Sequence, residues 1–531
     1  MGAPLFRRLL AVAALAMAFV ASALVTRLPF ADRTLFISDS VRYALAIEDY
    51  DLSVGRPHPP GNPLYVGMAK AVDGVIHDPP VSLAFLSAAL SGLALLFAWL
   101  LGKDVGGEGA GWLTAGILFT SPLFWFFGCV AMPATGEAAL SLAFAWTARR
   151  ARAHPRPGPF WVMTAVLAVA FGFRSTFAVL VLPLWLWAAW RHPWPRRAAG
   201  LLALAVAFAG WTTLVATLSG GFTPYGETTR AFFSEVVIAT KILGGGFGKI
   251  PMQLRDVGIS AVFALGLFLV PLAVGIVRCL WGRYPFPAAG PFLAAWALPM
   301  LGFHLVYDWA PRFAVPLMAP AALLAAVTVL PPVRRLAGAF PPALAGFALA
   351  LHAGLFLLPT HLGAWTLPDP YPGGRRLLSR NVELESKDAA VRARFDPQHT
   401  LVLAYDNAMH AAWFLPAYRV VGLFPLFKNA PDAWVPSAHG RRFSNEPGSG
   451  AIPDVDPLPI PPEITTVVLF DEDYLAYWPV EALPLSSTEA GAAGTLRTAA
   501  VLHPGCLAFG FRHLAWTPAG TGGCPGLVAR R

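Results

Sequence analysis

Long apolar runs separated by short polar turns dominate the first two thirds of the chain. Each run has about 20 residues, enough for an α-helix to cross a bilayer core of about 30 Å. The first run follows Arg7-Arg8 and has no convincing cleavage site before polar sequence, so we interpret it as a retained helix rather than a signal peptide. The pattern predicts eleven membrane-spanning helices, at about residues 9–28, 81–101, 110–128, 134–148, 159–173, 175–190, 198–218, 257–280, 289–307, 313–330 and 340–358.

From Trp365 onward the apolar runs shorten and turn residues multiply. The segments 400–405 and 465–470 have the length and composition of buried strands, and each is followed by polar or helical sequence. We therefore expect an α-helical polytopic membrane domain over residues 1–360 and a small α/β domain over residues 361–531.

The basic residues predict the orientation of these helices in the membrane. An odd number of crossings puts the chain ends on opposite sides of the membrane. With the N-terminus in the cytoplasm, the short basic loops all fall inside, as positive-inside statistics require. These loops contain Arg7-Arg8, Lys103, Arg149 to Arg152, Arg191 to Arg197, Arg278 to Arg283 and Arg334-Arg335. We expect an integral membrane protein with a cytoplasmic N-terminus, with residues 30–80, the loop 219–256 and the C-terminal domain extracytoplasmic.

Composition agrees with a membrane protein. Hydrophobic residues make up 56% of the 531 residues and charged residues 13%, about half the charge of a soluble protein. The net charge of +9 is explained by the inner loops and by anionic membrane lipids near them, so no nucleic-acid partner is expected.

The four cysteines divide into two pairs by position. Cys506 and Cys524 both lie in the expected outer domain, where an oxidising environment would allow a disulfide between them. Cys129 and Cys279 lie at opposite ends of their spans and are not expected to pair. The chain contains no Cys-x-x-Cys spacing typical of a metal site.

Polar residues directly follow the first span. Asp39 precedes Arg42 and Tyr43 in a short amphipathic segment, 38–47. Ser38 or Asp39 as a helix cap is one interpretation. The other is that Asp39 acts as a general base near the membrane surface, with Arg42 as a binding group for an anionic part of the substrate. The residues alone leave both open.

The run Arg56-Pro-His-Pro-Pro-Gly-Asn-Pro-Leu-Tyr65 is rigid and extended, because proline fixes its own φ and restricts the residue before it. Such a loop would lie flat on the bilayer, or it would hold His58 and Tyr65 against a substrate. Neither interpretation is favoured by the residues alone.

Two further sets of polar residues fall at the outer ends of predicted spans. Glu137 and Arg174 would form a structural ion pair, or Arg174 would bind a lipid phosphate through its two-pronged guanidinium. The spacing of His304, Tyr307, Asp308 and Arg312 places several of these residues on one helical face, where they would serve solvation or substrate binding.

Three motifs together resemble the GT-C-type membrane glycosyltransferases, the class that includes protein O-mannosyltransferases and bacterial aminoarabinose transferases. Asp39-Ser40-x-Arg42-Tyr43 is similar to the acidic pattern that follows the first span in that class. The block from Arg56 to Tyr65 resembles the His-Pro-Pro-Gly block of a bacterial branch, and Arg312-Phe-x-x-Pro316 resembles an element that begins a late span. Ser40 replaces the second acid of many members, which weakens any argument for a metal-binding acidic pair.

The resemblance implies inverting transfer of a sugar from a polyprenyl-phosphate-linked donor to an acceptor at the outer face of the bacterial inner (cytoplasmic) membrane. Asp39 would be the general base. Arg174 and Arg312 would stabilise charge on the leaving phosphate, while His58 and Glu137 would help to position the substrates. Arg42, Tyr43, Tyr65, His304 and Asp308 complete the expected substrate-binding set. No cofactor is required, and a divalent cation is not indicated. The acceptor, whether protein, lipid or glycan, is not identified.

Two other classes of function predict different patterns. A transporter or flippase for a lipid-linked sugar would have polar residues near the bilayer midplane and internal repeats. A non-catalytic scaffold of a polysaccharide assembly system would use the outer domain as its binding module. The ionisable residues instead gather at the outer ends of spans, which favours the transferase.

Overall fold

The computed structural model divides the chain into two compact units, which are discontinuous in sequence. Unit 1 comprises Met1–Asp32, Pro60–Leu218 and Gly246–Leu378; unit 2 comprises Arg33–Pro59, Ser219–Gly245 and Ser379–Arg531. The structure describes residues 3–35, 37–232, 250–286, 288–307, 310–336, 341–358, 361–362, 365–366, 373–404, 407–422, 434–435, 458–460, 463–471, 481–484, 495–500, 505–510 and 513–518.

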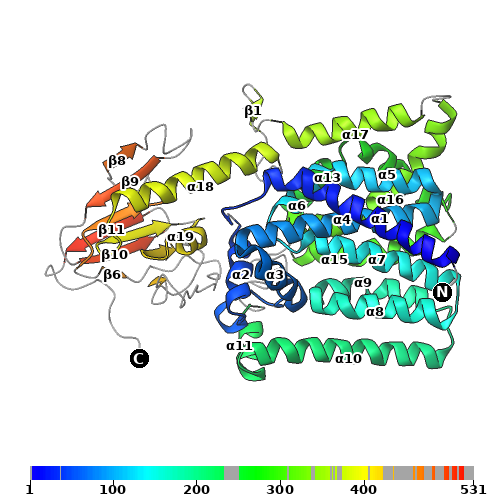
Figure 1. Ribbon diagram of the computed structural model, residues 1–531, viewed down its shortest axis with the longest axis horizontal. Coiled ribbons are helices and arrows are strands. Elements are labelled where there is room, and N and C mark those ends of the chain that lie inside the picture. The colour runs from blue at the N-terminus through cyan, green and yellow to red at the C-terminus, as the bar shows by residue number, and fades with distance from the viewer. Residues whose placement is uncertain are drawn as a thin grey trace. The chain divides into compact units, whose positions relative to one another are not determined.

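Unit 1 is a bundle of helices that lie side by side (Figure 1). Its N-terminal half contains α1 (Ala3–Arg27), α3 (Pro63–Ile76), α4 (Pro79–Gly106), α5 (Glu108–Thr120), α6 (Pro122–Cys129), α7 (Ala134–Ala153), α8 (Pro157–Phe173), α9 (Ser175–Ala189) and α10 (Trp194–Leu218). Its C-terminal half contains α13 (Ile250–Leu265), α14 (Leu269–Leu280), α15 (Ala289–Tyr307), α16 (Pro311–Leu336), α17 (Pro341–Leu357) and the short strands β1 (His361–Leu362) and β2 (Trp365–Thr366).

All eleven predicted spans coincide with helices. Within the described residues, six helices are long and apolar enough to cross a membrane, and a seventh span results if α5 and α6, bent by 62°, are counted together. The helices α8 and α9 and the described part of α17 are apolar but shorter. Many large apolar side chains on these helices are exposed, such as Trp190 at 74% and Leu202 at 66%, as expected for a surface that meets lipid.

The bundle packs around α4, which contacts α1, α5 and α7. Gly92 on α4 allows a close approach to α1, since a Cβ there would lie 2.5 Å from the Cα of Val20. Such small residues let helix backbones come together where lipid offers no hydrophobic driving force. The bend between α5 and α6 occurs at Ser121, whose hydroxyl accepts a hydrogen bond from the backbone N–H of Phe124.

Unit 2 combines the segment after α1 with the C-terminal part of the chain. It contains α2 (Ser38–Glu48), the 3₁₀ turn η2 (Leu52–Val54), α11 (Phe222–Ala231), most of α18 (Gly374–Arg394) and α19 (Ala408–Phe414). Its strands are β3 (Thr400–Ala404), β4 (Arg419–Gly422), β5 (Trp434–Val435), β6 (Leu458–Ile460), β7 (Thr466–Leu469), β8 (Glu481–Pro484), β9 (Thr495–Ala500), β10 (Gly505–Gly510) and β11 (His513–Pro518).

The main sheet of unit 2 is mixed, with the strand order β5-β4-β3-β7-β9-β8. β3 lies between β4 and β7 and runs parallel to both, whereas the other pairings are antiparallel. A second sheet has the order β11-β10-β6. A buried apolar cluster joins α18 and α19 to β3, β4 and β7, with residues such as Val391, Val402 and Ala411 fully buried.

The two strands predicted from sequence are confirmed as β3 and β7, which pair in parallel at the centre of the sheet. The helical polytopic fold is also confirmed. The division at residue 360 stays a prediction.

Candidate active site

The Asp39 cluster, made up of Asp39, Arg42, Tyr43 and His58, lies within unit 2. The first three residues come from α2, in which Asp39 occupies the first turn. Ile37 holds the N-cap position of this helix, so neither Ser38 nor Asp39 is its N-cap residue. A carboxylate in the first helical turn is stabilised by the positive end of the helix dipole.

Asp39 and His58 face each other. His58 Nδ1 lies 3.5 Å from Asp39 Oδ1, and each side chain is 16% exposed. The His58 ring lies between aromatic neighbours, 5.8 Å from the Tyr43 ring and 6.2 Å from the Phe232 ring, measured between centroids. The aromatic contacts set the position of the imidazole, and both side chains keep a small exposed fraction.

Arg42 is buried and points to the loop that leads to His58. Its Nη1 donates a hydrogen bond to the carbonyl oxygen of Gly55 over 3.2 Å. Burial lowers the pKa of Arg42 to about 10, although the nearby carboxylate of Asp39 acts in the opposite direction. Gly55 has a φ of 73°, a left-handed conformation that glycine adopts without steric strain. Arg42 therefore supports the turn before His58.

A second set of contacts braces the same loop. The backbones of Asp51 and Arg56 exchange two hydrogen bonds of 2.7 and 2.8 Å. Arg56 also pairs with Asp49, with 2.9 Å between Nη1 and Oδ2, and the Arg56–Pro57 peptide bond is cis. These contacts fold the segment after α2 back on itself, so that His58 returns to Asp39 on the helix.

The Phe313 cluster lies within unit 1 and contains Glu137, Arg174, His304, Arg312 and Phe313. Arg174 stands between α8 and α9 and pairs with Glu137 at the start of α7, with 2.8 Å between Nη1 and Oε1. The Glu137 side chain is 4% exposed and that of Arg174 18%. The predicted ion pair is thus present, and its acid is the more deeply buried partner.

The aromatic ring of Phe313 is the common neighbour of the cations. The guanidinium carbons of Arg174 and Arg312 lie 5.4 and 5.0 Å from its centroid, both within cation–π distance. The His304 ring stacks on the same phenyl ring, with centroids 4.2 Å apart and planes 11° apart. Phe313 was part of a sequence motif but was not predicted to organise the site.

Other predicted residues lie apart from these clusters. Tyr65, on α3, is fully buried in unit 1 with its ring 5.7 Å from that of Phe173, and burial raises the pKa of its phenol. Asp308 and Cys524 lie outside the described residues, and Cys506 is part of β10. The predicted disulfide therefore stays a prediction.

Within the described ranges, no group of three or more His, Cys, Asp or Glu side chains is arranged to hold a metal ion. The cofactor expectation remains untested.

Comparison with known proteins gives a result at the level of structure only. No protein-family model matches the chain, and no curated protein sequence matches it. ArnT from Cupriavidus metallidurans in the apo state matches with a TM-score of 0.54 and 16% identity, over 93% of this chain and 99% of that chain. The chain has the ArnT fold.

The same protein bound to undecaprenyl phosphate matches with a TM-score of 0.53 and 16% identity, over 91% of this chain and 97% of ArnT. The apo oligosaccharyltransferase of Archaeoglobus fulgidus gives a TM-score of 0.43 at 13% identity, over 75% of this chain and 63% of that chain. The similarity to ArnT confirms the GT-C-like fold expected from the sequence motifs, and the chain is an integral membrane protein. The predicted orientation in the membrane stays a prediction.

Proposed function

We propose that the chain is a GT-C-type glycosyltransferase that moves a sugar from a polyprenyl-phosphate-linked donor to an acceptor at the outer face of the membrane. The observation that carries the proposal is the ArnT fold over nearly the whole chain, because an ArnT structure of this fold is bound to undecaprenyl phosphate. The Asp39 and Phe313 clusters support the proposal because they offer the two kinds of group that such a transfer needs, a base and cations.

Asp39 acts as the general base in this proposal. Its carboxylate accepts the proton of an acceptor hydroxyl while the hydroxyl oxygen bonds to the anomeric carbon. The bond from that carbon to the phosphate oxygen breaks, its electron pair leaves with the polyprenyl phosphate, and the anomeric configuration inverts. The contact of Asp39 with His58 and its partly exposed position in the first turn of α2 support this role.

Arg174 and Arg312 bind the lipid phosphate in this proposal. A leaving phosphate gains negative charge, which guanidinium groups stabilise through charge-assisted hydrogen bonds. Both arginines stand beside Phe313, and Arg174 remains 18% exposed although it pairs with Glu137. Glu137 pairs with Arg174 at this site, and the His304 ring stacks on the phenyl ring of Phe313.

The test begins with a strain that lacks the gene, because the donor sugar is not identified. Mass spectrometry of its lipids is expected to show an accumulated polyprenyl-phosphate-linked sugar and loss of the corresponding glycan product. Wild type and Glu48→Gln are expected to reverse both changes, whereas Asp39→Asn is not. Glu48 is a matched control, since it lies on the same helix, α2, and is exposed.

The accumulated lipid then serves as the donor for the purified full-length protein in proteoliposomes. Release of polyprenyl phosphate, about 100-fold slower or more in Asp39→Asn, would support the transferase. Movement of the intact donor across the bilayer without release would instead identify a flippase. An unchanged lipid profile in the deletion strain would contradict the proposal and favour a scaffold.

A further inference from the structure

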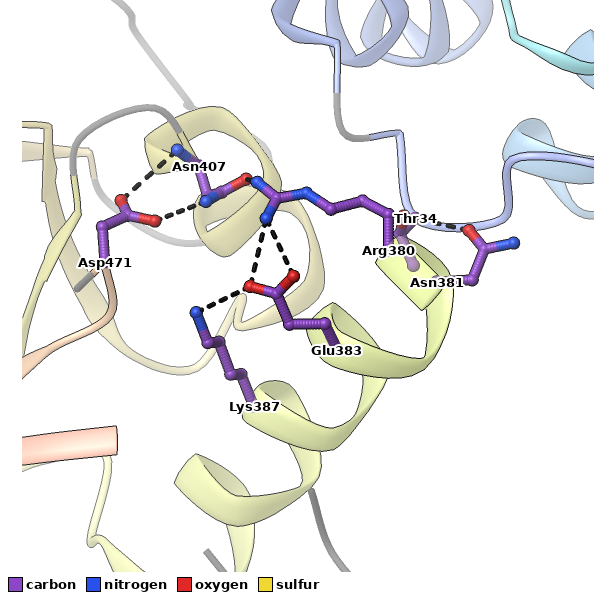
Figure 2. A network of polar contacts seen from close by, with 7 residues as sticks. All are labelled: Thr34, Arg380, Asn381, Glu383, Lys387, Asn407 and Asp471. Carbon is purple, nitrogen blue, oxygen red and sulfur yellow. Dashed lines mark hydrogen bonds and ion pairs between the residues drawn. The ribbon is translucent and has the colours of Figure 1, made fainter. Parts of the chain in front are cut away.

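The segment that leads into α2 is attached to α18 and α19 within unit 2. Asn381 Oδ1, on α18, accepts hydrogen bonds of 3.2 Å from the backbone N–H of Arg33 and from the hydroxyl of Thr34, and Figure 2 shows the Thr34 contact. The imidazole of His410, on α19, contacts the carbonyl oxygen of Thr34 through Nδ1. Thr34, Asn381 and His410 are all at least 98% buried. The exposed pair of Arg33 and Glu385 adds little.

Both ring nitrogens of the His410 imidazole have polar partners. Nδ1 faces a carbonyl oxygen, which only accepts, so Nδ1 carries a hydrogen. Nε2 lies 3.0 Å from Oδ2 of Asp388, on α18. The rings of Phe414 and Phe470 lie 4.6 and 5.9 Å from the imidazole. Both ring nitrogens therefore take part in polar contacts, and two aromatic rings lie beside the imidazole.

This attachment rests on the core of unit 2. Ala411 and Ala412 of α19 and Val391 of α18 belong to the buried cluster with β3, β4 and β7. α19 also packs directly on α2. Asn407, at the start of α19, bonds to Asp471 after β7 and to Arg380 of α18, so that polar contacts as well as the apolar core hold α18 and α19 together (Figure 2).

We propose that His410, held by Asp388, is a positioning residue for Asp39, an inference that rests on the proposed function. Thr34 lies five residues before Asp39 on the same segment. By fixing the Thr34 carbonyl, His410 sets where α2 begins and how its first turn is directed. A base displaced by about 1 Å loses much of its effect on the rate, so His410 contributes to transfer through the position of Asp39.

Two amide substitutions distinguish the roles of the two ring nitrogens of His410. An asparagine at position 410 places its side-chain nitrogen near the position of Nδ1, and a glutamine places it near that of Nε2. His410→Asn therefore keeps a donor for Thr34, whereas His410→Gln keeps only a donor for Asp388. Tyr418→Phe is the matched control, since its hydroxyl bonds to Val391 and Phe395 in the same core but not to the α2 segment.

Hydrogen exchange of the full-length protein tests the attachment without any assay of sugar transfer. Peptides that cover residues 38–48 are expected to exchange about 10-fold faster in His410→Gln, because the buried hydrogen bond to the Thr34 carbonyl is lost. The same peptides in His410→Asn and Tyr418→Phe should stay close to wild type. Equal exchange in all four proteins, or equal acceleration in both His410 variants and Tyr418→Phe, would overturn the proposal.

The kinetic readout separates positioning from stability. With the lipid donor that accumulates in the deletion strain, kcat is expected to fall about 10-fold in His410→Gln with KM unchanged, and His410→Asn should restore most of it. Faster exchange of α2 with an unchanged kcat would overturn the positioning role. If the wild-type protein released no polyprenyl phosphate, the proposed function would fail, while the exchange result would still decide whether His410 fixes α2.

Discussion

Asp39 Oδ1 and His58 Nδ1 lie 3.5 Å apart, and their side chains have the same small exposed fraction. They lie 19 positions apart in the chain, and the loop between them is folded back by the contacts of Arg42 and Arg56. The distance is longer than a good hydrogen bond, which is common for catalytic contacts without substrate. His58 is therefore well placed to orient the proposed base.

Two substitutions of His58 should distinguish the contribution of its aromatic ring from that of its Nδ1 atom. His58→Phe keeps the aromatic contacts with Tyr43 and Phe232 but offers no partner to Asp39. We expect kcat for release of polyprenyl phosphate to fall by roughly 10-fold, whereas His58→Asn, with an amide near the Nδ1 position, should retain most activity. Equal activity of His58→Phe and wild type would show that the contact with Asp39 is not used.

Acid should weaken unit 2 through Glu383. Burial acts to raise the pKa of Glu383, but Lys387 and Arg380 outweigh it and lower the pKa below its ordinary value of 4.5 (Figure 2). A carboxyl group with a depressed folded-state pKa adds stability above its unfolded pKa, and this contribution is lost as pH falls through the folded-state pKa. Its effect is therefore complete near neutral pH, and it declines as the pH falls from about 4.5 through the lower folded-state pKa.

The corresponding measurement is the thermal unfolding midpoint between pH 7 and pH 3.5. Glu383→Gln should lie below wild type at pH 7, and the difference should shrink as the pH falls. Glu385→Gln serves as the control, since Glu385 is a neighbouring acid on α18 whose side chain is 48% exposed. A difference between Glu383→Gln and wild type that stays constant with pH would refute the electrostatic explanation.

The fold was largely predictable because its signals are local. Apolar runs long enough for a bilayer locate the helices, and short buried runs locate β3 and β7. The polar motifs also lead to Asp39 and His58, which do meet in the structure. Their meeting depends on a loop whose path is set by Arg42 and Gly55, and no periodic pattern reveals such a path.

Contacts between distant segments were not predictable. His410 and Thr34 are 376 residues apart, and neither belongs to a recognised motif. A single buried histidine in an apolar helix carries no signal of its partner. Phe313 was similarly missed as an organising residue, because only the folded bundle brings Arg174 from the break between α8 and α9 beside α16. A single sequence can indicate which side chains have functional chemistry, but it cannot show which distant residues they contact in the fold.

The predicted disulfide can be tested by counting thiols. If Cys506 and Cys524 are joined, alkylation in denaturant without a reductant should modify two cysteines, Cys129 and Cys279, and reduction should raise the number to four. Cys524→Ser should expose one additional thiol before reduction, because Cys506 loses its partner. Four modified cysteines in the unreduced wild-type protein would rule out the bond.

Glu137 and Arg174 allow the structural and substrate-binding interpretations of their pair to be distinguished. Either substitution removes an ion pair from a largely buried site, so both Glu137→Gln and Arg174→Gln should lower the unfolding midpoint. Binding of undecaprenyl phosphate should respond differently. Arg174→Gln is expected to weaken it by about 10-fold or more, whereas Glu137→Gln removes a competitor for the guanidinium and should leave it unchanged or tighter.

Two further variants define the charge requirement at this position. Arg174→Lys keeps the charge but loses the two-pronged geometry and much of the stacking on Phe313, so its affinity for undecaprenyl phosphate should be intermediate. Arg150→Gln is the matched control, since Arg150 on α7 pairs with Asp104 and is half exposed. If both Glu137→Gln and Arg174→Gln lower stability while the affinity of each stays at the wild-type value, the pair is structural and the phosphate-binding role falls to other residues.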